Sequence, residues 1–167
     1  YYYSRLSNDN KNISLSQNEF YDDLSNIYEK ICHHNKYKTY KKILYGYSLG
    51  TGPTIFTSSK YKNISNVVLR SPYRSIREVC RYHYPTLYKI GGDCIVPDYF
   101  VNENIILRNK NILIVHGDND EVIPISHSIQ LKQIWDQHSN VKLLNISGLT
   151  HGGYFNIVPE IMKFFKF

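Results

Sequence analysis

Apolar side chains recur along this chain in two spacings, one typical of amphipathic helices and one typical of buried strands. Between residues 17 and 34 an apolar side chain returns every three or four positions, from Phe20 to Ile31, which predicts a helix. Short apolar runs follow, and the nearly continuous run at 112–115 indicates burial on both faces, as in a parallel sheet. The predicted strands cover residues 41–47, 66–69, 112–115 and 141–146, and the predicted helices cover residues 17–34, 50–59, 126–137 and 154–165.

The order of these elements predicts the fold class. Helices and strands alternate along the chain, which is typical of an α/β protein whose helices cover both faces of its sheet. We therefore predict a three-layer α/β/α sandwich with a mostly parallel sheet, forming a single domain over residues 1–167. Residues 73–104 interrupt the alternation with Pro85, Pro97 and a Gly-Gly pair, and we expect this segment to be a cap-like insertion.

The first predicted strand leads directly into a G-x-S-x-G pattern. It reads Gly46-Tyr47-Ser48-Leu49-Gly50, the nucleophile elbow of a serine hydrolase. A serine on a sharp strand-to-helix turn points outward, and we expect the backbone to crowd the positions two residues to either side. Glycine is then expected at both ends of the pattern. The pattern predicts that Ser48 is a nucleophile.

Two later loops carry the groups that a nucleophilic serine needs. The third predicted strand ends in a loop with Asp118, Asp120 and Glu121, and the last strand ends in a glycine-rich loop with His151. An imidazole can take the serine proton, and a carboxylate can hold that imidazole in the required tautomer. Because active groups gather at the carboxyl ends of the strands in such sheets, these side chains can meet. We predict a triad of Ser48, His151 and Asp120, with Asp118 and Glu121 as alternatives for the acid.

The other histidines do not indicate a metal site. His33 and His34 are adjacent on a predicted helix and so point to different faces. His116 precedes the acid loop, and we expect it to pack against or orient that loop. Three histidines lack a partner at ligand spacing: His83, His127 and His138. We predict neither a metal nor another cofactor.

Composition excludes some classes of protein and says little about function. A hydrophobic content of 42% with 20% charged residues indicates a folded globular protein rather than a disordered one. The net charge of +6 could attract nucleic acid or an anionic membrane, but the lysines are scattered, and we interpret them as a solvated surface. The 16 tyrosines, with many Asn, Ile and Lys residues, are typical of an AT-rich genome.

Cysteine usage and the absence of long apolar runs bear on the compartment. Cys32, Cys80 and Cys94 are an odd number without a C-x-x-C pair, which argues against a disulfide framework or a zinc site and favours a reducing compartment. No apolar run approaches the roughly 18–20 residues of a transmembrane helix. The start at Tyr1 does not resemble a signal peptide. We expect a cytoplasmic protein.

Taken together, these motifs resemble those of the α/β-hydrolase superfamily. Within it the chain resembles the alpha/beta hydrolase domain-containing protein 17 group of depalmitoylases, with the domain-containing protein 13 group close by. The matching segments extend over about residues 19–166. They are the elbow continuing to Thr54, the strand that ends at Ser71-Pro72, the acid loop at 116–123, and Gly148-x-x-His151.

The resemblance implies more than the residues alone. It implies that Asp120 rather than Asp118 is the acid, and that the N–H of Leu49 donates to an oxyanion. The family's second oxyanion donor follows an earlier strand, and no such strand and loop precede residue 40. We therefore expect an N-terminally truncated copy that lacks the N-terminal strands of the fold. The resemblance also implies peripheral association with the cytosolic face of a membrane.

Several functions remain open at this point. The leading hypothesis is a palmitoyl-protein thioesterase acting on an acylated protein. A lysophospholipase, monoacylglycerol lipase or general carboxylesterase acting on a lipid or other ester is the alternative, and a non-catalytic hydrolase-like interaction module is a second one. A nucleic-acid-binding module rests on net charge alone, so we expect no nucleic-acid partner. The aromatic residues of the insertion either line an acyl pocket or pack over the core: Tyr82, Tyr84, Tyr88, Tyr99 and Phe100.

Overall fold

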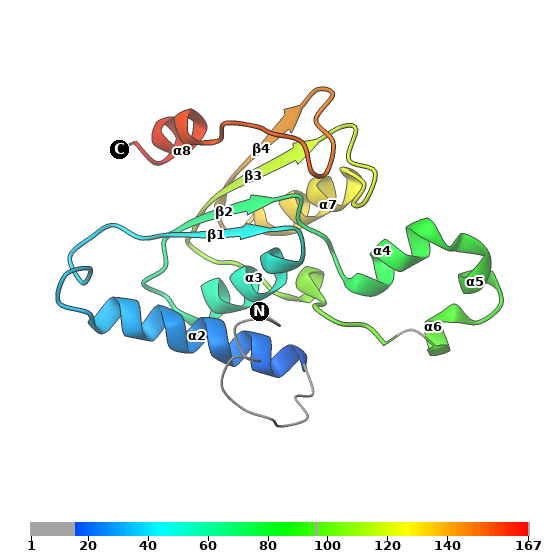
Figure 1. Ribbon diagram of the computed structural model, residues 1–167, viewed down its shortest axis with the longest axis horizontal. Coiled ribbons are helices and arrows are strands. Elements are labelled where there is room, and N and C mark those ends of the chain that lie inside the picture. Colours follow the sequence, from blue (N-terminus) through cyan, green and yellow to red (C-terminus); the bar gives the residue numbers. More distant parts are fainter. Residues whose placement is uncertain (1–15, 96, 167) are drawn as a thin grey trace.

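A sheet of four parallel strands forms the centre of the computed structural model, which describes residues 16–95 and 97–166 (Figure 1). The strands lie side by side in chain order, and each ends within two residues of its predicted bounds. They are β1 (Ile43–Tyr47), β2 (Asn66–Arg70), β3 (Asn111–Gly117) and β4 (Asn140–Ile146). The predicted parallel sheet is confirmed. Residues 1–15 of the predicted domain lie outside the described residues.

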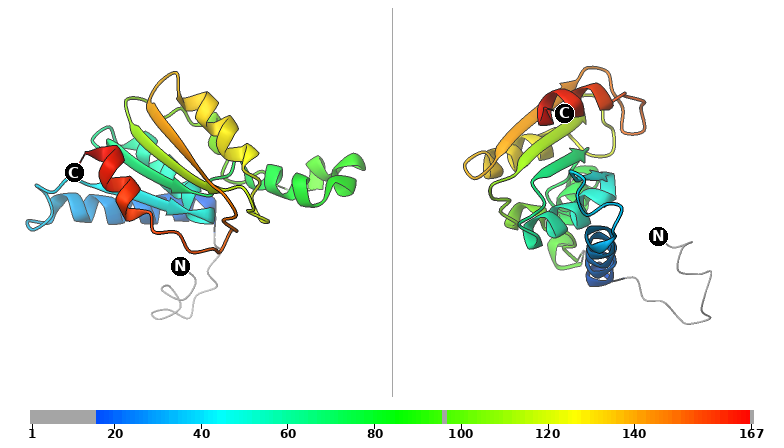
Figure 2. Two further views of the ribbon diagram at one scale, coloured as in Figure 1. Left: turned by 90° about the horizontal axis from the view of Figure 1, so that it is seen from above. Right: turned by 90° about the vertical axis from the view of Figure 1, so that its left-hand side faces the viewer.

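Helices cover both faces of this sheet, as the alternation of elements predicts (Figures 1 and 2). One face packs against α2 (Gln17–His33), α3 (Thr51–Lys60) and α7 (Ser126–Trp135), and the other packs against α8 (Val158–Phe165). The structure is therefore a three-layer α/β/α sandwich.

Strand β3 shows why the apolar run is nearly continuous. Ile112 and Ile114 belong to the cluster beneath α3 and α7, whereas Leu113 and Val115 belong to the cluster beneath α8. All four side chains are fully buried, because successive side chains of a strand point to opposite faces and both faces are covered. Burying each one contributes about 1.5–3 kcal/mol.

The ends of two helices follow from local hydrogen bonds. Helix α2 begins at Gln17 because Ser16 Oγ accepts from the Glu19 N–H while the Glu19 carboxylate accepts from the Ser16 N–H. Helix α8 begins at Val158 rather than at residue 154, so that predicted start is wrong. The Asn156 side chain accepts from the Val158 N–H, and a proline occupies the first turn, so the helix begins there and not earlier.

The segment at 73–104 contains short helices that project from the side of the sheet (Figure 1). They are α4 (Ile76–His83), α5 (Pro85–Lys89), α6 (Gly92–Ile95) and the 3₁₀ turn η2 (Asn102–Asn104). No residue of α4 or α5 is buried. His83 Nε2 lies 2.7 Å from the carbonyl oxygen of Val122, which ties the end of α4 to the acid loop. The role of this segment as a cap stays a prediction.

Candidate active site

The turn after β1 has the strained backbone expected of a nucleophile elbow. Ser48 has a φ of 51°, in the left-handed region that residues with a side chain rarely adopt. Gly46 is closely enclosed: a Cβ there would lie 2.6 Å from Thr54 Oγ1 and 2.8 Å from the Gly50 carbonyl oxygen. A larger residue at this position would therefore push the start of α3 away from β1.

The second glycine of the pattern is not crowded. A Cβ on Gly50 would meet nothing within 4 Å, and its φ of −64° and ψ of −13° are ordinary helical values. The expectation that sterics require glycine at both ends is therefore correct for Gly46 and wrong for Gly50. The reason is that the carbonyl oxygen of Gly50 faces Gly46, whereas its α-carbon faces open space.

The structure brings the three predicted residues into one chain of hydrogen bonds. Ser48 Oγ lies 2.9 Å from His151 Nε2, and His151 Nδ1 lies 2.9 and 3.0 Å from the two carboxylate oxygens of Asp120. Because the carboxylate only accepts, Nδ1 carries a proton, and Nε2 is the nitrogen that faces the serine hydroxyl. The side chains come from the loops after β1, β3 and β4, at the carboxyl ends of parallel strands.

The surroundings of Asp120 keep this carboxylate ionised. Its side chain is only 1% exposed, and its Oδ1 accepts from the N–H groups of Val122 (3.0 Å) and Ile123 (2.8 Å). Burial by itself would raise the pKa of Asp120. Hydrogen bonds from His116, the Ile123 N–H, His151 and Ser71 outweigh burial and hold that pKa well below its usual range.

The two alternative acids, Asp118 and Glu121, contact the backbone of the loop after β4 (residues 147–153, the histidine loop) rather than the imidazole of His151. Asp118 Oδ1 accepts from the Gly148 N–H at 2.7 Å, and Glu121 Oε2 accepts from the His151 N–H at 3.1 Å. That hydrogen bond from His151 is the main reason that the pKa of Glu121 is lowered. Asp118 and Glu121 therefore fasten the loop, and Asp120 is the carboxylate that meets His151 Nδ1.

His116 connects the acid loop to α7 through hydrogen bonds of its ring. It is fully buried, its Nε2 donates to the Ile123 carbonyl oxygen at 2.8 Å, and its Nδ1 lies 2.6 Å from Ser128 Oγ. The same Nε2 is 3.4 Å from Asp120 Oδ2. These contacts confirm the interpretation that His116 orients the acid loop.

Leu49 follows the serine in the 3₁₀ turn η1 (Ser48–Gly50) that precedes α3. Amides at the start of a helix point outward without partners in the helix, so the Leu49 N–H is suited to an oxyanion beside Ser48. The Leu49 carbonyl oxygen accepts from Tyr73 Oη at 3.2 Å, which fixes the orientation of the following peptide. The oxyanion role itself stays a prediction.

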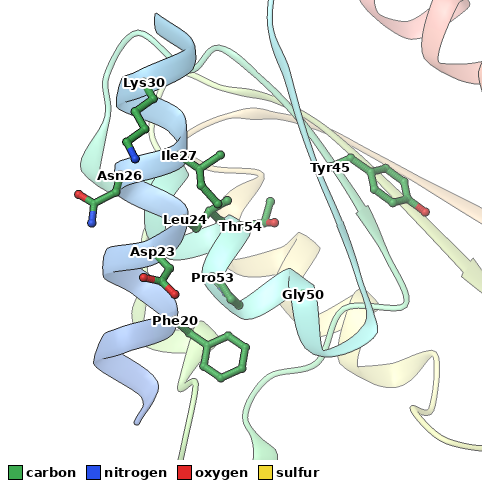
Figure 3. A pocket seen from close by; sticks show the side chains of 10 residues that line it. All are labelled: Phe20, Asp23, Leu24, Asn26, Ile27, Lys30, Tyr45, Gly50, Pro53 and Thr54. Atoms are coloured by element: carbon green, nitrogen blue, oxygen red, sulfur yellow. The ribbon is translucent and has the colours of Figure 1, made fainter. Parts of the chain in front are cut away.

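A cavity of about 500 Å³ lies between α2, α3 and β1 and reaches Gly50, two residues from Ser48. In Figure 3 the Phe20, Leu24, Ile27 and Pro53 side chains lie between the two helices, whereas the Tyr45 side chain points away from them. Apolar and polar residues both line it, namely Phe20, Asp23, Leu24, Asn26, Ile27, Lys30, Tyr45, Gly50, Pro53 and Thr54.

The aromatic residues of the 73–104 segment do not line this cavity. Tyr82, Tyr84 and Tyr99 are exposed, whereas Phe100 is buried and contacts Tyr21 and Tyr73 edge-on. Of the two interpretations left open for these aromatics, packing over the core therefore applies to Phe100.

Neither a metal site nor a membrane span is present within residues 16–95 and 97–166. No three His, Cys, Asp or Glu side chains of this part of the chain lie together in a way that would hold a metal ion. None of its helices combines the length and the apolar character that crossing a bilayer requires.

No family model matches the chain, but comparisons with known proteins find relatives that are similar in sequence. The chain is 36% identical to protein L404 of Acanthamoeba polyphaga mimivirus, named as an α/β hydrolase, over 71% of this chain and 41% of L404. It is also 36% identical to human alpha/beta hydrolase domain-containing protein 17B, over 53% of this chain and 28% of that protein. It therefore spans less than half the length of either relative.

A solved structure shares the fold. The esterase of Pyrococcus furiosus matches with a TM-score of 0.65 at 17% sequence identity, over 86% of this chain and 60% of the esterase. At that identity the likeness concerns the arrangement of helices and strands alone.

Proposed function

Because this chain belongs to the α/β-hydrolase superfamily, we propose that it is a serine hydrolase that cleaves an acyl thioester or ester through an acyl-enzyme. The observation that carries the proposal is the hydrogen-bonded chain from Ser48 through His151 to Asp120. The arrangement suits nucleophilic catalysis, because the Asp120 carboxylate is ionised and meets His151 Nδ1 while the Ser48 hydroxyl lies next to His151 Nε2.

The first half of the proposed reaction acylates the serine. His151 Nε2 takes the proton from Ser48 Oγ as Oγ attacks the acyl carbonyl carbon, and the Leu49 N–H donates to the oxyanion that forms. Asp120 stabilises the resulting imidazolium through Nδ1. The tetrahedral intermediate then expels the thiol or alcohol, which takes the proton from His151 Nε2, and the acyl group remains on Ser48.

The second half releases the acid. A water molecule gives its proton to His151 Nε2 and attacks the acyl carbon, and Ser48 Oγ leaves with the proton from Nε2. The fatty acid departs and the resting hydrogen bonds are restored. Because the imidazole gives and takes one proton in each half, the cycle needs no other proton carrier.

Protein S-palmitoyl thioesters are the substrate class that we place first. The motif resemblance to the domain-containing protein 17 group supports this choice, as does the 36% identity to human protein 17B. Carboxylic esters, including lysophospholipids and monoacylglycerols, come second, because a solved structure with the same fold is named as an esterase. The apolar cavity beside Gly50 has a volume that could take part of an acyl chain in either case.

A fluorophosphonate probe tests the nucleophile. We expect the probe to label Ser48 in the full-length protein, and Ser48→Ala to abolish labelling. Ser59→Ala is the matched control, because Ser59 Oγ only donates to a carbonyl within α3 and should not affect labelling. Absence of labelling in a folded full-length protein would contradict the proposed function.

A chain-length series separates the substrate classes. Hydrolysis of p-nitrophenyl esters from acetyl to palmitoyl is compared with release of palmitate from an S-palmitoyl peptide. A depalmitoylase should favour the long chain and the thioester, whereas preference for short chains would indicate a general carboxylesterase.

A further inference from the structure

Tyr47, the last residue of β1, contacts the histidine loop at His151. Its hydroxyl donates to the His151 carbonyl oxygen at 2.7 Å, and its ring lies against the His151 imidazole, with centroids 5.4 Å apart and planes inclined by 29°. Tyr47 therefore touches both the backbone and the ring of the residue that faces Ser48. Its position in the G-x-S-x-G pattern can be filled by any residue, so the motif itself assigns no role to it.

Arg70, the last residue of β2, supports the same loop. Tyr47 and Arg70 are paired in register across β1 and β2, so both side chains leave the sheet on the same face. The guanidinium carbon lies 4.8 Å from the centroid of the Tyr47 ring, and Nη2 donates to the Gly153 carbonyl oxygen. Arg70 thus holds the Tyr47 ring through a cation–π contact and holds the loop two residues beyond His151.

The loop that carries His151 is rich in glycine. Gly148, Gly152 and Gly153 surround His151, and Gly148 has a φ of 73°. Glycine loses more conformational freedom on folding than any other residue, so contacts from outside must define where the loop lies. Asp118 and Glu121 accept hydrogen bonds from its N–H groups, whereas Tyr47 and Arg70 donate to its carbonyl oxygens.

We propose that Tyr47 and Arg70 are positioning residues that hold His151 Nε2 in line with Ser48 Oγ during both proton transfers. The inference rests on the proposed function and adds two residues to its machinery. Neither side chain touches the reacting atoms; both act through the backbone and ring of His151. Small displacements of a catalytic group, of the order of 1 Å, can reduce a rate by about 100-fold, so contacts that prevent them bear directly on turnover.

Two substitutions test the hydroxyl and the guanidinium separately. Tyr47→Phe keeps the ring and removes the hydrogen bond to His151, and we expect kcat to fall about 3- to 10-fold. Arg70→Met removes the charged donor and the cation–π contact, and we expect a fall of about 10- to 100-fold. KM should stay within about twofold in both variants, because neither residue binds the substrate in the proposal. Arg70→Lys, which keeps the charge, should recover part of the loss.

Matched controls lie away from the site and from the cavity. Tyr40→Phe changes a tyrosine before β1 that is 60% exposed, and Arg108→Lys changes an arginine that meets His138 far from the elbow. Both should leave kcat unchanged. The double variant Tyr47→Phe/Arg70→Met should lose less than the product of the single losses, since both side chains stabilise one loop.

Two readouts distinguish positioning from a general loss of folding. Turnover is expressed per active site, titrated with the fluorophosphonate probe, because a partly unfolded sample has fewer sites but an unchanged kcat per site. Proton NMR follows the downfield resonance of the His151 Nδ1–H bonded to Asp120, which should broaden or shift in both variants and stay in place in the controls.

The outcomes separate the two proposals. If the full-length protein is labelled and active but both variants keep wild-type kcat per site and an unchanged Nδ1–H resonance, the positioning inference is wrong and the proposed function stands. If the full-length protein is neither labelled nor active, the proposed function fails. The resonance then still decides whether Tyr47 and Arg70 hold His151 in place.

Discussion

At the scale of single residues, burial and hydrogen bonds together determine the charge of two side chains, Asp120 and His127. Asp120 is buried among donors and stays ionised, and His127 is buried close to Arg74 and His116 and stays neutral. His127 is 5% exposed, and its Nδ1 accepts from the Arg74 N–H at 3.1 Å. Burial, aided by the positive charge of Arg74 and by His116, lowers the pKa of His127 to about 4.

His127 should therefore make the protein acid-sensitive. Its pKa is lower in the folded state, at about 4, than the unfolded value of 6.5, so the unfolded state binds more protons between these values. The contribution of neutral His127 to the free energy of unfolding is fully present above pH 6.5 and is lost as the pH drops toward 4. The slope that this residue causes is at most about 1.4 kcal/mol per pH unit.

Urea unfolding at a series of pH values checks this expectation. His127→Gln should flatten the dependence of the unfolding free energy on pH in this window, whereas His33→Gln, at an exposed position on α2, should not. An equally steep dependence in the wild type and in His127→Gln would show that other groups cause the acid sensitivity.

At the scale of elements, the histidine loop packs directly against the end of β3. A Cβ on Gly117, the last residue of β3, would lie 1.8 Å from the Leu149 carbonyl oxygen. No side chain can occupy that space, so the loop after β4 rests directly on the backbone of β3. Strand end and histidine loop therefore form one packed unit.

Gly117→Ala should displace the histidine loop. We expect a loss of stability of about 1–3 kcal/mol and a larger proportional loss of kcat per titrated site, because the displaced loop carries His151. Gly152→Ala is the matched control within the same loop, since a Cβ there would meet nothing within 4 Å. Unfolding free energies and turnover are measured on both, and equal effects would contradict the role given to close packing.

The arrangement of the strands explains which parts of the fold and of the site can be predicted from the sequence. The central strands β2 and β3 are predictable because both faces of the sheet are covered there, so their apolar runs are nearly unbroken. Ser48, Asp120 and His151 are predictable because they lie in the loops after β1, β3 and β4. Tyr47 and Arg70 are not predictable in this way, because their contact arises from the register between two strands 18 residues apart. The open space at Gly50 and the late start of α8 depend likewise on local geometry that the residue pattern does not encode.

At the scale of the whole molecule, the projecting helices α4 and α5 are less buried than the helices of the sandwich. Helix α7 has four buried residues, whereas α4 and α5 have none, and α4 meets the acid loop through His83. Regions with few buried contacts open more readily than a packed core. The projecting segment should therefore open locally while the sheet stays folded.

Hydrogen exchange followed by mass spectrometry tests this expectation. Amides of α4 and α5 should exchange about tenfold faster or more than those of α7, a packed helix of similar length, under conditions in which β3 is fully protected. Protection in α4 equal to that in α7 would show that the segment is held as firmly as the sandwich.

The distance along the chain between Ser48 and His151 has a consequence for how the protein folds. The two side chains meet across 103 positions of sequence. Strands β2 and β3 lie between β1 and β4 in both the chain and the sheet. Contacts between residues so far apart form late, because the chain must close long loops first. During refolding, hydrolytic activity should thus reappear after helical circular dichroism has recovered, and its time course would report the completion of the sheet.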